Sequence, residues 1–163
     1  MIPELPVPEM GSVTASALAE VLATQFMLSA ISAPDDKSNA NQTEHYLVGS
    51  VELTGGLFSG YVQLQLPEAF VAKLTAALLG PYAANVTDED AADVTGELCN
   101  MLAGRIAATL TAAGYSSILS IPTVSRGRRA EFENAPGAKT CRTSWTCEGH
   151  LLKVVSQFSF RSR

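Results

Sequence analysis

With 163 residues, 47% of them hydrophobic and 17% charged, the chain is long enough for one domain with a buried core, and its low charge suggests that another chain covers part of its surface. The formal net charge of −5 argues against nucleic acid or an acidic membrane as its partner. No apolar run reaches the roughly 18 residues of a membrane-spanning helix, and the N-terminus lacks the basic-then-apolar pattern of a secretion signal, so we expect a cytoplasmic protein.

The N-terminal segment combines a proline-rich stretch with a helical pattern. Three prolines among residues 1–10 predict an extended, flexible tail, so a single domain is expected to span residues 11–163. From about residue 12 to residue 31, apolar residues recur with the spacing of one helix face. The predicted apolar face consists of Leu18, Val21, Leu22, Leu28 and Ile31.

A β-hairpin and a second helix are predicted next. After a polar loop over residues 34–44, apolar and polar residues alternate over residues 45–53 and again over residues 60–66, which is typical of two paired strands. Pro67 then stands at the first position of a helix, where proline is favoured, and a Gly-Pro pair at residues 80–81 ends that helix. Its predicted buried stripe consists of Phe70, Val71, Leu74 and Leu78.

One long helix is predicted over residues 88–113. Thr87 is a plausible N-cap, and three carboxylates over residues 88–90 favour the positive end of the helix dipole. No proline interrupts the chain before Pro122. At about 100° per residue, one narrow polar stripe is formed by Asp93, Glu97, Asn100 and Gly104. The opposite side, which should face the core, carries Leu98, Leu102 and Ile106.

The polar stripe has two interpretations. Carboxylates and amides on the outer side of a helix are ordinary, and spacing alone favours a solvated face. However, the only charge between Leu98 and Ser125 is Arg105, and small residues prolong the stripe toward the helix end. A helix with so small and uncharged a surface can accept a closely packed partner. The stripe is therefore either a solvated face or a site that holds a carboxylate and a carboxamide one turn apart.

The segment after this helix is predicted to form a strand at a sheet edge. Gly114 provides a C-cap, and residues 117–125 have a strand pattern. Pro122 lies within that strand and implies an edge or a bulge, since proline cannot donate to a central ladder. Residues 126–129 form the only basic cluster, which we interpret as a solvated loop rather than a binding patch.

The C-terminal part is predicted to be a second hairpin, with strands over residues 139–147 and 151–160 joined by a Glu-Gly turn. Cys141 and Cys147 share one face of the first strand about 20 Å apart, which is too far for a disulfide. Since Cys99 lies in the long helix, three reduced thiols are the simplest interpretation. The predicted element order is α-β-β-α-α-β-β-β, which indicates an α+β domain with an antiparallel sheet and long helices packed on it.

Several catalytic devices are missing from the sequence. It contains no Gly-x-x-x-x-Gly-Lys phosphate loop and no Gly-x-Ser-x-Gly nucleophile elbow. His45 and His150 have no companion residues at metal-ligand spacing, so neither a metal site nor a histidine-based nucleophile is expected. If the chain is an enzyme, Glu97 and Asn100 are its candidate catalytic residues.

The same stripe carries a family resemblance. Asp93-x-x-x-Glu97-x-x-Asn100 resembles the Asp/Ser-x-x-x-Glu-x-x-Asn signature of the CheC/CheX/FliY chemotaxis phosphatases, and the run from Gly96 to Gly104 resembles the CheX version. Gly114-Tyr115 and the segment over residues 120–124 also resemble the CheX strand that follows this helix. The similarity covers roughly residues 12–160.

A second copy of the signature begins in the first predicted helix. Ser16 and Glu20 match it, but Ala23 stands where the asparagine should be. Relatives in the broader family can carry two copies. Because only the later copy is complete here, we expect one active site per chain.

The resemblance implies a CheC/CheX-like fold, a homodimer, and the dephosphorylation of a phospho-aspartyl, CheY-like response regulator. It gives Asn100 the role of orienting the hydrolytic water and Glu97 that of pairing with a lysine of the regulator's active site. Asp93 would support the contact, and Gly104 would lie against the rim of that site. No cofactor is expected in this chain, because the regulator supplies the Mg²⁺.

The alternative is a non-catalytic protein: an adaptor that binds a receiver domain, or an interaction module like those of the flagellar switch. The sequence feature that separates the two classes is the Glu97/Asn100 pair. A decayed pair would favour the adaptor, and the pair is intact.

Overall fold

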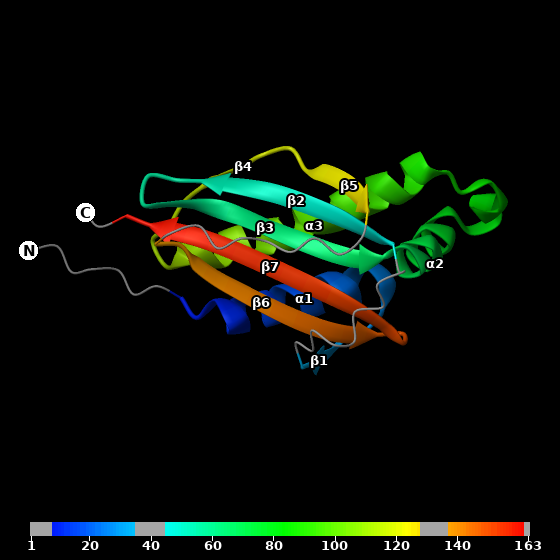
Figure 1. The fold of residues 1–163 in the computed structure, drawn as a ribbon, viewed down its shortest axis with the longest axis horizontal. Helices are drawn as coiled ribbons and strands as arrows, with labels where there is room; N and C mark the ends of the chain where they lie inside the picture. The colour runs from blue at the N-terminus through cyan, green and yellow to red at the C-terminus, as the bar shows by residue number, and fades with distance from the viewer. Residues whose placement is uncertain (1–7, 35–44, 128–136, 162–163) are drawn as a thin grey trace, which may run out of the picture.

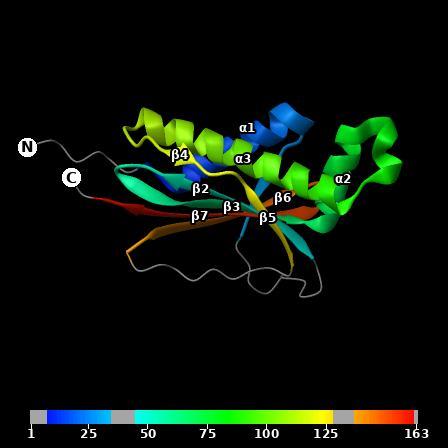
Figure 2. The same cartoon turned by 90° about the horizontal axis from the view of Figure 1, so that it is seen from above.

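The computed structural model describes residues 8–34, 45–127 and 137–161, in which helices cover one face of an antiparallel sheet (Figures 1 and 2). This confirms the predicted α+β class. The elements are α1 (Met10–Phe26), β1 (Ile31–Ala33), β2 (Tyr46–Thr54), β3 (Phe58–Pro67), α2 (Glu68–Leu79), the 3₁₀ helix η2 (Gly80–Asn85), α3 (Asp88–Ala112), β4 (Ile118–Leu119), β5 (Thr123–Gly127), β6 (Lys139–Cys147) and β7 (His150–Phe160).

The two predicted hairpins are confirmed, and they form the centre of the sheet. The strand order is β1-β6-β7-β3-β2-β4, and β5 pairs with β2 beside β4. The β6–β7 turn consists of Glu148 and Gly149, which both have positive φ values, 49° and 77°. A two-residue hairpin turn with two positive φ angles matches the twist of the strands that it joins. It therefore fixes the pairing of Cys147 with His150.

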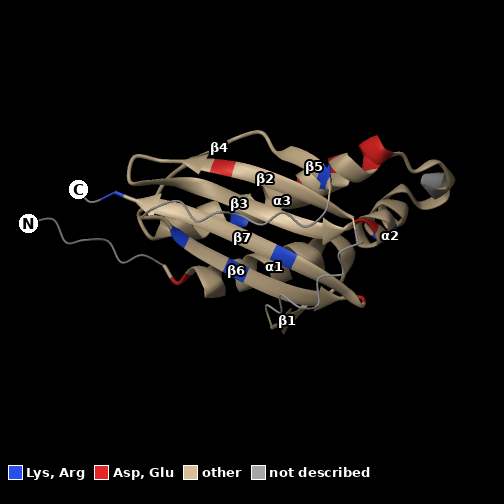
Figure 3. Ribbon diagram, viewed as in Figure 1, with Lys and Arg blue, Asp and Glu red and all other residues tan. Residues whose placement is uncertain are grey.

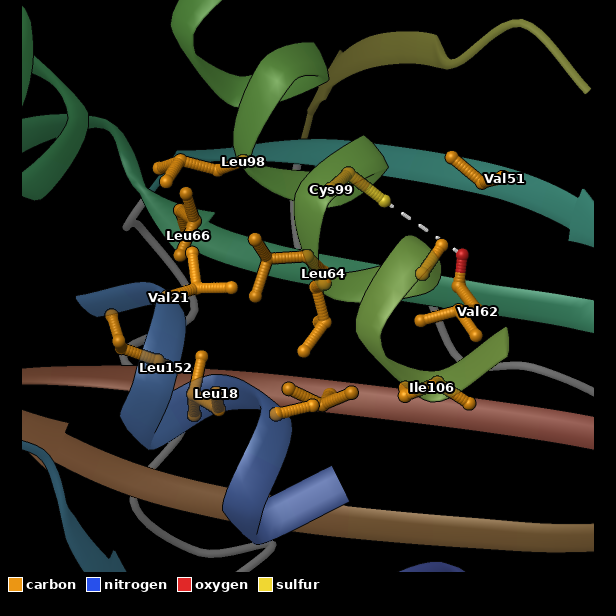
Figure 4. Packing of buried hydrophobic residues seen from close by; sticks show 14 of the residues in the cluster. Leu18, Val21, Val51, Val62, Leu64, Leu66, Leu98, Cys99, Ile106 and Leu152 are labelled. Atoms are coloured by element: carbon orange, nitrogen blue, oxygen red, sulfur yellow. Dashed lines mark hydrogen bonds between the residues drawn. The ribbon is translucent and has the colours of Figure 1, made fainter. Parts of the chain in front are cut away.

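All three described α-helices lie on the same face of the sheet (Figure 2). Helix α3 rests mainly on β2, and a glycine permits this approach: a Cβ atom at Gly49 would lie 2.8 Å from the Cβ atom of Cys99. The Cys99 thiol is fully buried and donates a long hydrogen bond, 3.8 Å, to the carbonyl of Val62 (Figure 4). This burial raises the pKa of Cys99 to about 12.

The core lies between the sheet and the helices. Leu98, Leu102 and Ile106 are buried, which confirms the predicted inner side of α3. Figure 4 shows Leu98 and Ile106 among side chains of α1, β3 and β7. Burial of each such side chain contributes about 1.5–3 kcal/mol to folding. The rotation of α3 about its axis, and hence the direction of its outer side, is fixed by this packing.

Two predictions about helix faces were wrong. Helix α1 ends at Phe26 rather than near Ile31, because Met27 takes a left-handed conformation (φ 53°) and its N–H closes the last turn. Ile31 instead opens β1 and is 73% exposed. In α2, Leu78 is exposed, and Thr75 is the buried residue on the last turns of the inner side.

The predicted strand over residues 117–125 is divided into β4 and β5, with Pro122 in the break. Among the described strands, both pair only with β2, at the end of the sheet, so the predicted edge position is confirmed. Arg126 and Gly127 belong to β5, and the prediction of a solvated loop is wrong for these two residues. Arg128 and Arg129 lie outside the described residues.

The N-terminal boundary differs slightly from the predicted tail over residues 1–10. Helix α1 begins at Met10, and the carboxylate of Glu9 caps it by accepting from the N–H groups of Gly11 and Ser12. Residues 1–7 lie outside the described part, as does the predicted polar loop after Pro34.

Cys99, Cys141 and Cys147 are all free, as predicted. Among the helices that the structure describes, none combines the length and hydropathy that a membrane crossing requires.

Candidate functional site

The start of α3 is fixed by local hydrogen bonds. The Thr87 hydroxyl accepts from the N–H of Asp90 at 3.1 Å, and the Asp90 carboxylate accepts from the N–H of Thr87 at 2.9 Å. This reciprocal capping box satisfies two N–H groups that a helix start leaves unpaired. Three acidic residues in the first turn add favourable interactions with the helix dipole. The predicted start of the helix is thereby confirmed.

The predicted site residues lie along one outer side of α3. Asp93 and Glu97 are exposed, and Asn100 and Gly104 are half-buried. We call these four residues the α3 polar face. The side chains of Glu97 and Asn100 stand three residues apart, a rise of about 4.5 Å along the helix. The structure therefore brings all four predicted positions onto a single surface directed away from the core.

The polar groups of this face are not engaged elsewhere. Within residues 8–34, 45–127 and 137–161, no hydrogen bond or ion pair involves the side chain of Asp93, Glu97 or Asn100. Nearby carboxylates differ in this respect: Asp90 caps α3, and Glu20 pairs with a cation. The carboxylates and the carboxamide of the α3 polar face are therefore available to a partner.

Gly104 is not required by the packing of the chain itself. A Cβ atom at this position would have no atom within 4 Å outside its own helix turn and chain neighbours. Gly96, by contrast, faces β5, where a Cβ atom would lie 3.3 Å from the Cγ2 atom of Val124. A glycine inside a helix costs about 0.5–1 kcal/mol relative to alanine. Nothing within the described chain offsets this cost at Gly104, which is the pattern expected where a partner must approach closely.

The incomplete copy of the signature lies on α1. Ser16, Glu20 and Ala23 are all exposed there. Glu20 forms an ion pair with Arg105 of α3 at 2.6 Å, so its carboxylate is occupied by a contact between the two helices. With an alanine in place of the amide and a carboxylate that is already paired, α1 lacks the groups that α3 offers.

Other candidate chemistry is accounted for by packing. Among the described residues, no group of three or more histidine, cysteine, aspartate or glutamate side chains is placed to hold a metal ion. The ring of His150 lies 5.5 Å from that of Phe70, as part of the contact between β7 and α2. His45 is exposed at the start of β2.

Arg126 has a structural role that sequence reasoning missed. Its guanidinium forms ion pairs with Glu68 at the start of α2 and with Asp88 at the start of α3, the latter at 3.2 Å. Figure 3 shows the acidic residues at these two helix starts close to the basic end of β5. The three residues are far apart in the sequence, so their spacing carried no signal.

Sequence reasoning also missed that the β4–β5 segment borders the α3 polar face. Pro122 and Val124 rest against Gly96, one helix turn before Asn100. The one signal in the sequence was Gly96 itself, because a glycine without a side chain allows another segment to come close to the helix.

The comparisons with known proteins agree with this architecture. The family model of the chemotaxis phosphatase CheX matches residues 47–143, which is more than half of the chain and includes all of α3. A CheY-P phosphatase CheX from Thermotoga maritima is 34% identical over 90 residues, which are 55% of this chain and 57% of that protein. The matched region thus spans little more than half of the relative's length.

Solved structures share the fold over nearly the whole chain. The chemotaxis protein CheX from Vibrio vulnificus superimposes with a TM-score of 0.77 at 17% identity and covers 93% of this chain and 97% of its own. A chain of the CheX–CheY–BeF₃–Mg²⁺ complex from Borrelia burgdorferi gives a TM-score of 0.69 at 15% identity and covers 93% and 98%. With its family-model match and its fold, this chain belongs to the CheX family of chemotaxis phosphatases.

Proposed function

We propose that the chain is a phosphatase that hydrolyses the phospho-aspartate of a CheY-like response regulator. The observation that carries this proposal is the α3 polar face, where an intact Glu97/Asn100 pair points away from the core and is not engaged by the described chain. Two relatives support it. The Thermotoga maritima relative is named a CheY-P phosphatase, and the Borrelia burgdorferi protein is found in a complex with CheY.

Asn100 is assigned the role of orienting the attacking water. Phosphoryl transfer requires mainly positioning and charge stabilisation from the protein. The carboxamide oxygen accepts a hydrogen bond from water while the NH₂ group donates one, and the side chain adds no negative charge near the phosphoryl group. A water held in line with phosphorus turns a random encounter into a pre-oriented one.

The other members of the α3 polar face are assigned to binding. Glu97 pairs with a lysine in the active site of the regulator, and Asp93 supports that contact. Gly104 allows the rim of the regulator to approach the helix backbone, because no side chain stands there. The Mg²⁺ of this reaction belongs to the regulator, so this chain needs no cofactor of its own. A receiver substrate also implies action in the cytoplasm.

A second candidate is a receiver-binding adaptor or a flagellar-switch-like module without catalysis. An adaptor needs the same docking surface but no water-orienting amide. The free carboxamide of Asn100 favours catalysis, since the incomplete copy of the signature on α1 carries Ala23 at the asparagine position and that helix forms without an amide there.

The decisive experiment measures phosphate loss from a panel of phosphorylated receiver domains in Mg²⁺, with and without the protein. The phosphatase proposal expects at least one receiver to lose phosphate many times faster when the protein is present. Binding of a receiver without any acceleration would instead identify an adaptor. An Asn85→Ala variant is a matched control, because Asn85 is an exposed asparagine in η2, outside the α3 polar face.

A further inference from the structure

A large apolar side chain is displayed beside the α3 polar face. Ile121, in the short connection between β4 and β5, is 86% exposed. An isoleucine left in water forgoes the stabilisation that burial would give it. Nothing within the described chain covers this side chain. The residues around it therefore indicate which kind of partner would cover it.

The connection that carries Ile121 is held on both sides. On one side, the N–H of Glu52 donates to the hydroxyl of Ser120 and the N–H of Ser120 donates to the carbonyl of Glu52, both at 2.9 Å. On the other side, Pro122 packs against α3, where a Cβ atom at Gly96 would lie 3.8 Å from its Cβ atom. Ile121 is therefore presented outward between two fixed neighbours.

The contacts of β5 along α3 indicate that Ile121 lies within one interface radius of Asn100. Gly96 and Asn100 are one helix turn apart, about 6 Å, and differ by only about 40° around the helix. Arg126 contacts Asp88 and Pro122 contacts Gly96, so the chain from Arg126 back to Ile121 runs along α3 in the direction of Asn100. A standard interface covers about 800 Å² of each partner, a disc of roughly 16 Å radius. A partner centred on Asn100 would therefore cover Ile121 as well.

The charges around the β4–β5 connection indicate the chemistry of this contact. Arg105 is the only charged residue between Leu98 and Ser125, and it pairs with Glu20 on the side of α3 that faces α1. Along the β4–β5 connection itself, the border of the α3 polar face therefore carries no charged side chain, and the nearest charge given by the contacts of the connection is the exposed carboxylate of Glu52 on β2, beside Ser120. This border fits a partner surface that is apolar next to a charged active site.

We propose that Ile121 is an apolar contact for the receiver domain and contributes to the choice of receiver. This inference rests on the proposed function, which places a receiver on the α3 polar face. A second copy of this chain is a poorer occupant, because a copy seated on Ile121 would also cover Asn100. Ile121 acts on binding and not on the hydrolytic step.

The test compares Ile121→Ser with Ile31→Ser in the full chain. Ile31 is an exposed isoleucine on β1, five strands from β4 across the sheet, a separation of about 24 Å. Receiver affinity is measured by direct titration with phosphorylated receiver domains, together with kcat, KM, molecular mass and melting temperature. Ile121→Ser should weaken affinity about 10-fold or more and raise KM to match, with kcat and melting temperature unchanged. Ile31→Ser should leave the affinity per chain unchanged.

Two results would overturn the proposal. One is an unchanged receiver affinity in Ile121→Ser. The other is a fall in molecular mass that only Ile121→Ser causes, which would assign the β4–β5 connection to contact between copies of this chain. Failure of the proposed function gives a different result. A receiver that binds through Ile121 but does not lose its phosphate faster would refute catalysis and leave the proposed contact supported.

Discussion

Asn100 and Glu97 make separable contributions if the α3 polar face acts as proposed. Asn100→Ala should lower kcat about 10²–10³-fold with receiver affinity nearly unchanged, because an amide that orients water acts mainly in the transition state. Glu97→Ala should chiefly weaken binding, since it removes one partner of a charge pair at the contact. Phosphate-release kinetics on a responsive receiver separate the two effects.

Neither substitution should unfold the protein, because both side chains point away from Leu98, Leu102 and Ile106. Circular dichroism melting provides the control. A large drop in melting temperature for both variants would mean that the polar face is structural. Folded variants with wild-type activity would place the site elsewhere.

Two variants of Gly104 separate its effect on stability from its effect on receiver binding. Gly104→Ala should raise the free energy of unfolding by about 0.5–1 kcal/mol, since nothing in the described chain obstructs a Cβ atom there. Gly104→Leu should keep the fold and weaken receiver binding by blocking close approach. Denaturant unfolding and receiver titration measure the two effects.

A matched comparison is available at Gly49. Gly49→Ala should destabilise the protein by about 1–3 kcal/mol, because its Cβ atom would meet the Cβ atom of Cys99 at 2.8 Å. If Gly104→Leu binds receivers as tightly as the wild type, no partner approaches the helix at Gly104.

At the scale of elements, the burial of Cys99 between α3 and β2 should make the free energy of unfolding depend on pH in the alkaline range. The folded pKa of Cys99 is raised to about 12 by burial, whereas an unfolded thiol titrates near 8.5. Above about pH 9 the unfolded chain loses this proton and the folded chain keeps it, so the stability should fall as the pH rises from 9 toward 12.

Cys99→Ala should reduce the slope of melting temperature against pH in this range relative to the wild type. The residual slope belongs in part to Cys141 and Cys147, whose pKa values burial also raises. An identical slope in both proteins would show that the Cys99 thiol reaches solvent in the folded state.

The unfolded protein, without prior reduction, should show three thiols when it is titrated with a thiol reagent.

Elements were predictable where their signals are local. The start of α3 was correct because Thr87, Asp90 and an acidic first turn act within a few residues of one another. The end of α1 was missed because Met27, not a glycine, takes the left-handed conformation there. Strand β1 was missed because three residues form no pattern.

The same distinction holds for the candidate site. The outer side of α3 follows from helix periodicity, so the orientation of Glu97 and Asn100 could be predicted. Its border could not, because the packing of Pro122 on Gly96 and the ion pairs of Arg126 join residues that are distant in the sequence. Such contacts depend on the topology of the sheet.

At the scale of the whole molecule, we expect a homodimer. The sheet ends in the short strands β1 on one side and β4 and β5 on the other, and unpaired strand edges favour addition of another chain. Pairing along β1 would leave the α3 polar face open to receivers. Light scattering at micromolar concentration should give twice the chain mass of 17.2 kDa, and one receiver should bind per chain. A mass of one chain, independent of salt, would contradict this expectation.

The position of Asn100 outside the core also bears on how such a protein changes during evolution. Folding selects the inner side of α3, whereas nothing in the core depends on the amide. If Asn100 acts as proposed, a single substitution there would abolish hydrolysis without a folding penalty; α1, which carries Ala23 where the signature has asparagine, is an intact helix. On that assignment, one substitution would change a phosphatase with this fold into a non-catalytic receiver-binding protein. Selection for stability alone would not oppose this change.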